Sequence, residues 1–177
     1  MILTISGLHG TGKSTIGKLL AEKLSINYYS TGQAFRDLAK EMNFTLEEFT
    51  EYVEENPDID KKLDQKIIEI AQNNDVVIDS QLSAYILESI ADFKILLTCP
   101  LEIRVKRMTG RDNASYNEKL KETIKREQSE LERFEILYNI DLNDSEKRTE
   151  IYDLILDTGT LTVEEVIQKI LSSIKDL

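Results

Sequence analysis

The sequence predicts a doubly wound α/β fold, in which helices cover both faces of a parallel sheet. Short apolar runs recur along the chain, stretches with helical spacing of apolar residues lie between them, and the first run leads straight into a glycine-rich turn. The runs are apolar almost throughout rather than at alternate positions, which is typical of strands buried on both faces. Strands that alternate with helices in this way indicate parallel pairing through crossover connections.

Five apolar runs are the predicted strands, and the second is the weakest of them. They are Ile2–Ser6, Asn27–Ser30, Val76–Asp79, Phe93–Thr98 and residues 152–157. Directly after the first run, apolar residues at Ile16, Leu19, Leu20 and Leu24 have the spacing of one helix face. The chain therefore begins with a strand, a glycine-rich turn and a helix.

Residues 31–74 do not fit the simple alternation, because they hold more chain than one crossover helix needs. Within them, Thr45 and Glu48 form the pattern of a capping box at a helix start, and Pro57 interrupts the chain before a further helix. The acidic residues between 47 and 60 lack a tight ligand spacing, which favours a solvated helix face over a metal cluster. We expect a helical insertion after the second strand.

Residues 108–117 are a second exception to the alternation. Their sequence, MTGRDNASYN, is polar and contains glycine and arginine. This composition predicts a mobile loop between two helices, which could serve as a lid.

The composition limits the classes of function. The chain has 177 residues and a formal net charge of −11, which argues against a protein that coats DNA or RNA but not against one that holds a small nucleotide. The single cysteine, Cys99, excludes an internal disulfide, and no apolar stretch approaches the ~18 residues of a membrane span. The start of the chain also lacks the basic region of a signal peptide. We expect one domain in a cytoplasmic monomer that binds neither long nucleic acid nor a membrane.

The glycine-rich turn carries the clearest chemical signal. Its pattern is Gly7, four residues, then Gly12, Lys13 and Ser14, which is the P-loop. Glycines let the backbone turn its N–H groups toward phosphate oxygens, and the following helix presents its positive end to the same anion. Lys13 would reach the terminal phosphates and Ser14 would ligate Mg²⁺. The alternative is a glycine-rich turn with a chance lysine, which the strand–loop–helix context disfavours.

Several further stretches resemble the nucleoside monophosphate (NMP) kinases, and specifically the cytidylate kinases of the archaeal type. They are ISGLHGTGKST, STGQAFRDLAKEMNFTLEEF, ENPDIDKKLD, TIKREQSELERF, YNID and IYDLILDT. The resemblance covers nearly the whole chain. It implies a three-layer αβα P-loop NTPase fold with a five-stranded parallel sheet, an NMP-binding insertion at 31–74, a lid at 108–117 and a core formed by 1–30, 75–107 and 118–177.

The resemblance also implies roles for individual residues. The ATP-binding residues would be Gly7, Leu8, His9, Gly10, Thr11, Gly12, Lys13, Ser14 and Thr15. The NMP-binding residues would be Thr31, Gly32, Phe35, Arg36, Asp60, Asp64, Gln81 and Arg133. The catalytic residues would be Lys13, Arg107, Arg111 and Arg126, and the Mg²⁺ ligands Ser14 and Asp79.

Two positions depart from the pattern that the family usually shows. After the third strand the family has a glycine and an arginine that contacts the monophosphate, whereas this chain has Ser80 and Gln81. Glutamine keeps a hydrogen-bond donor but lacks the charge and the fork that suit a phosphate. The other position is His9, where proline is more usual.

Other interpretations of the same side chains remain open. Arg104 is favoured as part of a solvated basic face, and Arg126 and Arg133 share a helix face on which surface pairing with glutamates is the alternative. Asp79 would either hold a Mg²⁺-bound water or cap a helix. His9 is favoured as an exposed ring near the nucleotide rather than as a general base.

The function that the sequence predicts is transfer of a phosphoryl group from Mg·ATP to CMP or dCMP, by a transferase of pyrimidine nucleotide metabolism. Such transfer needs alignment, neutralisation of charge and exclusion of water rather than covalent help from the protein. One alternative is a kinase of the same fold with another acceptor, such as AMP or a small non-nucleotide alcohol, which Ser80 and Gln81 motivate. A second alternative is a nucleotide-binding regulatory protein that has lost efficient transfer.

Overall fold

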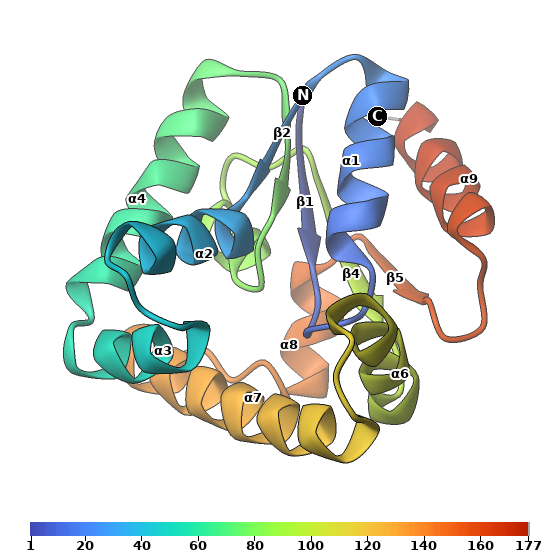
Figure 1. The fold of residues 1–177 in the computed structure, drawn as a ribbon. Helices are drawn as coiled ribbons and strands as arrows, with labels where there is room; N and C mark the ends of the chain where they lie inside the picture. The colour runs from blue at the N-terminus through green and yellow to red at the C-terminus, as the bar shows by residue number, and fades with distance from the viewer. Residues whose placement is uncertain (177) are drawn as a thin grey trace.

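The structure, a computed structural model, describes residues 1–176; residue 177, which the predicted core includes, lies outside the described part. Five parallel strands form one sheet in the order β2-β3-β1-β4-β5 (Figure 1). The strands are β1 (Ile2–Ser6), β2 (Asn27–Ser30), β3 (Val76–Asp79), β4 (Phe93–Thr98) and β5 (Leu154–Asp157). The prediction of five parallel strands is confirmed. The fifth strand begins two residues late, because the N–H of Tyr152 still bonds to Arg148 O at the end of the preceding helix.

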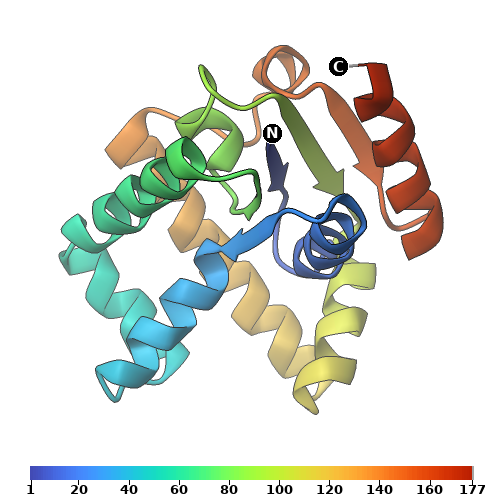
Figure 2. The same ribbon diagram turned by 90° about the horizontal axis from the view of Figure 1, so that it is seen from above.

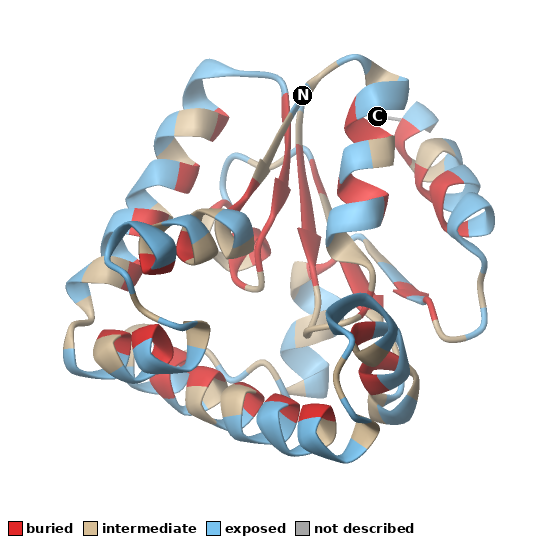
Figure 3. Cartoon of the chain, viewed as in Figure 1, coloured by how far each residue is buried: buried red, intermediate tan, exposed pale blue. Residues whose placement is uncertain are grey.

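Helices cover both faces of the sheet, as the sequence predicts (Figure 2). On one face, α1 (Lys13–Leu24) and α9 (Val163–Ser173) pack Leu20 and Ile167 against Leu3, Ile5 and Ile95 of the strands, and all five side chains are fully buried. The short helix η1 (Ile174–Asp176) follows α9. On the other face lie α4 (Asp58–Asn73), α5 (Ser83–Ile86) and α8 (Ser145–Ile151). Burial is greatest along the three inner strands, β1, β3 and β4 (Figure 3), which accounts for their lack of apolar alternation.

The expected insertion is helical throughout. It consists of α2 (Thr31–Glu41), α3 (Leu46–Glu55) and α4. Its side chains form a small apolar cluster of their own around Phe35, Phe49 and Val53. The predicted capping box is present at the start of α3, where Thr45 and Glu48 satisfy each other's backbone N–H groups.

The predicted loop at residues 108–117 is mostly wrong. The helix α6 (Leu101–Asp112) continues through Met108, and α7 (Tyr116–Tyr138) begins after only three residues. Met108 is buried on the inner face of α6, so its packing sustains the helix although its neighbours are polar. The turn is made by Asn113, which adopts the left-handed conformation that ends α6.

The helix α7 runs past the carboxyl ends of the strands (Figure 1). It packs against α6 at one end, and Lys125 and Ser129 contact glutamates of α3 further along. The carboxyl edge of the sheet, the insertion and α7 therefore enclose a common space. No helix within residues 1–176 combines the length and the apolar character needed to cross a bilayer.

The position of Gly7 yields a stability prediction. Its φ is +145°, and a Cβ there would press into the backbone carbonyl of Leu97. Gly7→Ala should therefore lower the free energy of unfolding by about 2–4 kcal/mol, measured by chemical denaturation. Gly110 is a matched control, because a Cβ added to this helical residue would meet no atom within 4 Å. Gly110→Ala should raise the stability by about 0.5–1 kcal/mol, and equal effects at the two glycines would contradict the account.

Candidate active site

The P-loop opens onto the N-terminus of α1. Gly10 and Gly12 have φ values of +79° and +96°, and Gly12 precedes the helix without a side-chain cap or an acidic residue in the first turn. The first turn of α1 thus contributes no carboxylate of its own that would compete for these N–H groups. Such an uncapped helix end, approached through glycines, is a ready anion site.

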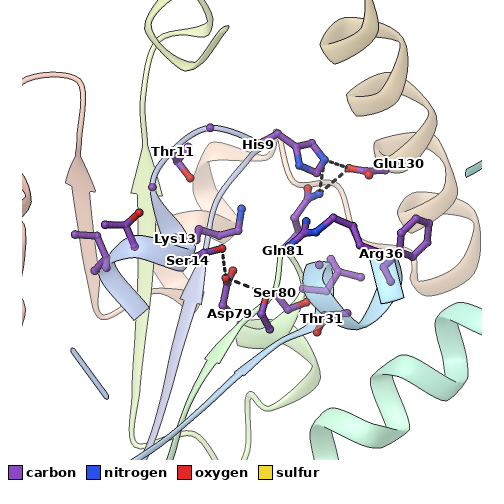
Figure 4. A pocket seen from close by; sticks show the side chains of 18 of the residues that line it. His9, Thr11, Lys13, Ser14, Thr31, Arg36, Asp79, Ser80, Gln81 and Glu130 are labelled. Atoms are coloured by element: carbon purple, nitrogen blue, oxygen red, sulfur yellow. Dashed lines mark hydrogen bonds and ion pairs between the residues drawn. The ribbon is translucent and has the colours of Figure 1, made fainter. Parts of the chain in front are cut away.

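Lys13 lies beside this helix end and points across the loop (Figure 4). Its Nζ donates to the backbone oxygen of Leu8 at 3.1 Å. Desolvation lowers the pKa of Lys13 from its ordinary value, while the nearby carboxylates of Asp79 and Glu130 act in the opposite direction. A phosphate placed here would supply further negative charge to this ammonium group.

Asp79 ends β3 at the carboxyl edge and is 3% exposed. Its Oδ2 accepts hydrogen bonds from Ser14 Oγ at 2.6 Å, Tyr28 OH at 2.8 Å and Ser30 Oγ at 3.2 Å. Burial and the Asp79 charge raise the pKa of Tyr28 to about 12, which keeps this phenol a donor. These partners are side-chain hydroxyls rather than backbone N–H groups of a helix end, so within the described chain Asp79 connects the start of α1 to β2.

Ser14 and Asp79 present oxygen atoms that suit Mg²⁺. Hydroxyl and carboxylate oxygens are the hard ligands that Mg²⁺ prefers, and this ion usually takes only one or two protein ligands beside phosphates and waters. Two such oxygens lie 2.6 Å apart at the mouth of the P-loop, so the donor set fits. Among residues 1–176, no group of three or more His, Cys, Asp or Glu side chains is placed to hold a metal.

Positive side chains from several helices meet over this loop. Arg36 of α2, Arg111 of α6 and Arg126 of α7 all line one cavity of about 470 Å³. Burial, and then repulsion from Arg111 and Arg126, lowers the pKa of Arg36. Like charges without an equal number of counter-charges create a strong positive potential, which an anion would relieve.

Arg107 and Arg104 both contact the backbone of the P-loop. Arg107 donates to Thr158 Oγ1 at 3.0 Å and lies 3.4 Å from Gly10 O, so it joins the P-loop to the end of β5. The expectation of a solvated Arg104 is wrong: this side chain is buried, ion-paired with Glu127, and donates to His9 O at 2.8 Å. Arg104 thus holds the P-loop backbone from behind.

The exposed ring predicted for His9 is also wrong. The ring is 21% exposed and its Nε2 lies 2.6 Å from Glu130 Oε2. The amide Nε2 of Gln81 donates to the same oxygen at 2.6 Å. Both positions at which the sequence departs from the family's usual pattern therefore meet on one carboxylate.

The end of the cavity away from the P-loop holds two acidic residues of α4 and two residues of α7. Arg133 Nε lies 2.7 Å from Asp60 Oδ2, but the two groups are not aligned as a hydrogen bond. Among the described residues, both atoms and Arg133 Nη1 consequently have no hydrogen-bond partner. Tyr138 OH donates to Asp64 Oδ2 beside them. Buried polar atoms of this kind are costly unless a ligand or water pairs with them.

Nearly all the residues predicted for the site line the one cavity. They are His9, Gly10, Thr11, Gly12, Lys13, Ser14, Thr15, Thr31, Gly32, Phe35, Arg36, Asp60, Asp64, Asp79, Gln81, Arg107, Arg111, Arg126 and Arg133. Gly7 and Leu8 line a smaller cavity behind the loop instead. Sequence reasoning missed Glu130, Tyr138, Tyr28 and Thr158. The one available signal was the spacing of Arg126 and Glu130, four residues apart on a helix.

A parallel αβα sheet with a P-loop after β1 and a cation-lined cavity at its carboxyl edge defines a P-loop nucleotide-binding protein of the kinase type. The sequence pattern of the cytidylate kinase-like family matches residues 2–160, and the chain belongs to this family.

Similar proteins of known sequence extend over the full chain. A cytidylate kinase of Methanocaldococcus jannaschii is 41% identical, in an alignment that covers 100% of this chain and 99% of that protein. A cytidylate kinase of Aeropyrum pernix is also 41% identical, covering 94% of this chain and 95% of that protein.

Solved structures are similar in fold at much lower identity. An uncharacterised protein of Eubacterium ventriosum matches with a TM-score of 0.73 at 18% identity, covering 100% of this chain and 99% of that one. The shikimate kinase of Acinetobacter baumannii in complex with shikimate matches with a TM-score of 0.62 at 18% identity, covering 99% and 93%. These likenesses confirm the three-layer fold alone.

The environment of Asp64 yields a prediction about pH. Burial, assisted by the Asp60 charge and opposed by the Tyr138 hydrogen bond, raises the pKa of Asp64 from 3.8 to about 6. The ionised carboxyl is thus disfavoured in the folded protein, and stability is lost as the pH rises between these two values. Asp64→Asn keeps the acceptor for Tyr138 and removes the charge. Its free energy of unfolding, relative to the original protein, should increase from about pH 4 to about pH 7 in denaturation at each pH. A difference that stays constant over this range would contradict the assignment.

Proposed function

We propose that the protein transfers the γ-phosphoryl group of ATP to CMP or dCMP. The observation that carries this proposal is one continuous cavity, in which the P-loop, three guanidinium groups and a polar pocket with unpaired donors and acceptors follow one another. Two nucleotides with their phosphates facing each other need this order of groups. Membership of the cytidylate kinase-like family and the names of the similar full-length proteins support the same function.

The donor would occupy the P-loop end. The loop amides and Lys13 would bind its terminal phosphates, and Arg107, which contacts both Gly10 and Thr158, would fix the adjoining part of the loop. Mg²⁺ would be held by Ser14, with Asp79 behind it. When bound, this ion neutralises phosphate charge and aligns the phosphate oxygens.

The phosphate of the acceptor would lie among Arg36, Arg111 and Arg126. Repulsion among these groups would be relieved when a phosphate enters, so binding would be strongest for the doubly negative monophosphate. Arg111 is 69% exposed in its side chain and pairs with its neighbour Asp112 at 2.6 Å. It is therefore free to move toward the transferring group, together with the three-residue turn between α6 and α7. This turn and the last turn of α6 would act as the lid.

The base would lie between α4 and α7. The exocyclic amino group of cytosine donates hydrogen bonds, and carboxylates are its natural acceptors. Asp60 would accept from this amino group, and Arg133 would donate to the ring acceptors beside it; within the described structure the two side chains form an ion pair, but each has atoms without a hydrogen-bond partner. Uracil presents an oxygen at the position of the amino group and would face the Asp60 carboxylate unfavourably. Thr31, Gly32 and Phe35 would complete the acceptor side.

The same proposal includes a monomer that works in the cytoplasm. A complete set of donor, acceptor and base groups within one chain supports the monomer, because the cavity needs no residue from a second copy.

An acceptor panel tests the proposed function. Purified protein with Mg·ATP is assayed for ADP formation with CMP, dCMP, UMP, AMP, shikimate and gluconate. We expect CMP and dCMP to have a kcat/KM at least about 10-fold above that of UMP, because one hydrogen-bonded group distinguishes cytosine from uracil. Transfer to none of the nucleotides would contradict the proposal. Transfer to a small alcohol alone would show that the protein is a kinase of the same fold with a non-nucleotide acceptor.

A further inference from the structure

Glu130 is the least exposed acidic side chain in the wall of the cavity apart from Asp79, at 6% exposure. It lies near the middle of α7 and faces the P-loop rather than solvent. Its charge acts on Lys13 across the cavity. A carboxylate in such a place is costly unless its oxygens are paired.

Each oxygen of Glu130 has partners from a different part of the fold. Oε1 accepts from Arg126 Nε at 2.9 Å, one helical turn earlier on α7. Oε2 lies 2.6 Å from His9 Nε2 in the P-loop and 2.6 Å from Gln81 Nε2, which follows β3 (Figure 4). The carboxylate thus connects α7 to the P-loop and to the segment that follows β3.

Arg126 needs such an anchor. It faces Arg36, and the repulsion between the two contributes to the lowered pKa of Arg36. Without a carboxylate at its Nε, a long side chain of this kind would turn toward solvent, away from the other cations. The bond to Oε1 uses only Nε, so the terminal nitrogens stay available to a phosphate.

We propose that Glu130 is a positioning residue that holds Arg126 against the reacting phosphates. This inference rests on the proposed function. Glu130 itself touches no substrate in this account; it acts through Arg126, while His9 and Gln81 hold its second oxygen in place.

Glu130→Gln tests the proposal, because it preserves size but removes the charge and half of the acceptor capacity. We expect kcat with CMP to fall about 10- to 100-fold, which corresponds to a hydrogen bond to a charged group, while the KM for ATP stays within about twofold. Glu132→Gln is the matched control, since Glu132 lies two residues further along the same helix and is exposed. It should leave both constants unchanged.

A double-mutant cycle separates positioning from a merely structural role. If Glu130 acts through Arg126, Glu130→Gln combined with Arg126→Ala should be no slower than Arg126→Ala alone. A purely structural contribution would multiply the two losses and would raise the KM for ATP as well. Multiplied losses, or full activity of Glu130→Gln, would overturn the proposal.

An NMR measurement that needs no catalytic turnover separates the test of Glu130 from the test of the proposed function. The ¹⁵N–¹H signal of Arg126 Nε, assigned by its loss in Arg126→Ala, should be protected from solvent exchange in the original protein and in Glu132→Gln. Glu130→Gln should lose this protection. An unprotected signal in the original protein would overturn the role of Glu130 whichever acceptor is used. Inactivity with every nucleotide, combined with a protected signal, would refute the proposed function alone.

Discussion

Cationic side chains from several elements are gathered in one cavity of this protein. The chain carries a net charge of −11, yet within the described residues six lysine and arginine side chains and only four carboxylates line the same space of about 470 Å³. A positive site within an acidic protein attracts small anions while the surrounding surface repels nucleic acid. Burial lowers the pKa values of Lys13 and Arg36, and repulsion from Arg111 and Arg126 lowers that of Arg36 further; a bound polyphosphate would offset both effects.

The fold creates this concentration through its sheet. Parallel strands place their carboxyl ends at one edge, so the P-loop after β1 and Asp79 at the end of β3 become neighbours. The helices α6 and α7 then cross the same edge and bring in their arginines. Two buried carboxylates organise the result: Asp79 orders the hydroxyl groups around the P-loop, and Glu130 orders the guanidinium and amide groups above it.

Much of this was predictable because the signals were local. The P-loop pattern, the apolar runs of the strands and the capping box at Thr45 depend on neighbours in the sequence, and the predicted strands and capping box are confirmed, with the fifth strand beginning two residues late. The features that sequence reasoning did not predict depend on packing between segments far apart in the sequence. Nothing near Arg104 in the sequence shows that it supports the P-loop from behind, and the polar composition of residues 108–112 concealed a helix that Met108 anchors. The meeting of His9, Gln81 and Glu130 joins segments up to 121 residues apart, which no spacing rule detects.

The most direct test of a shared cavity for both nucleotides is the binding of a single ligand that spans it. Adenosine and cytidine joined by five phosphates should bind by calorimetry with one site per chain and at least about 100-fold more tightly than ATP, because the second half binds without a further loss of translational freedom. Arg36→Met should weaken this ligand but not ATP, whereas Lys40→Met, a change at an exposed residue of the same helix, should weaken neither. An affinity no greater than that of ATP would show that the two halves of the cavity are not one site and would contradict the account.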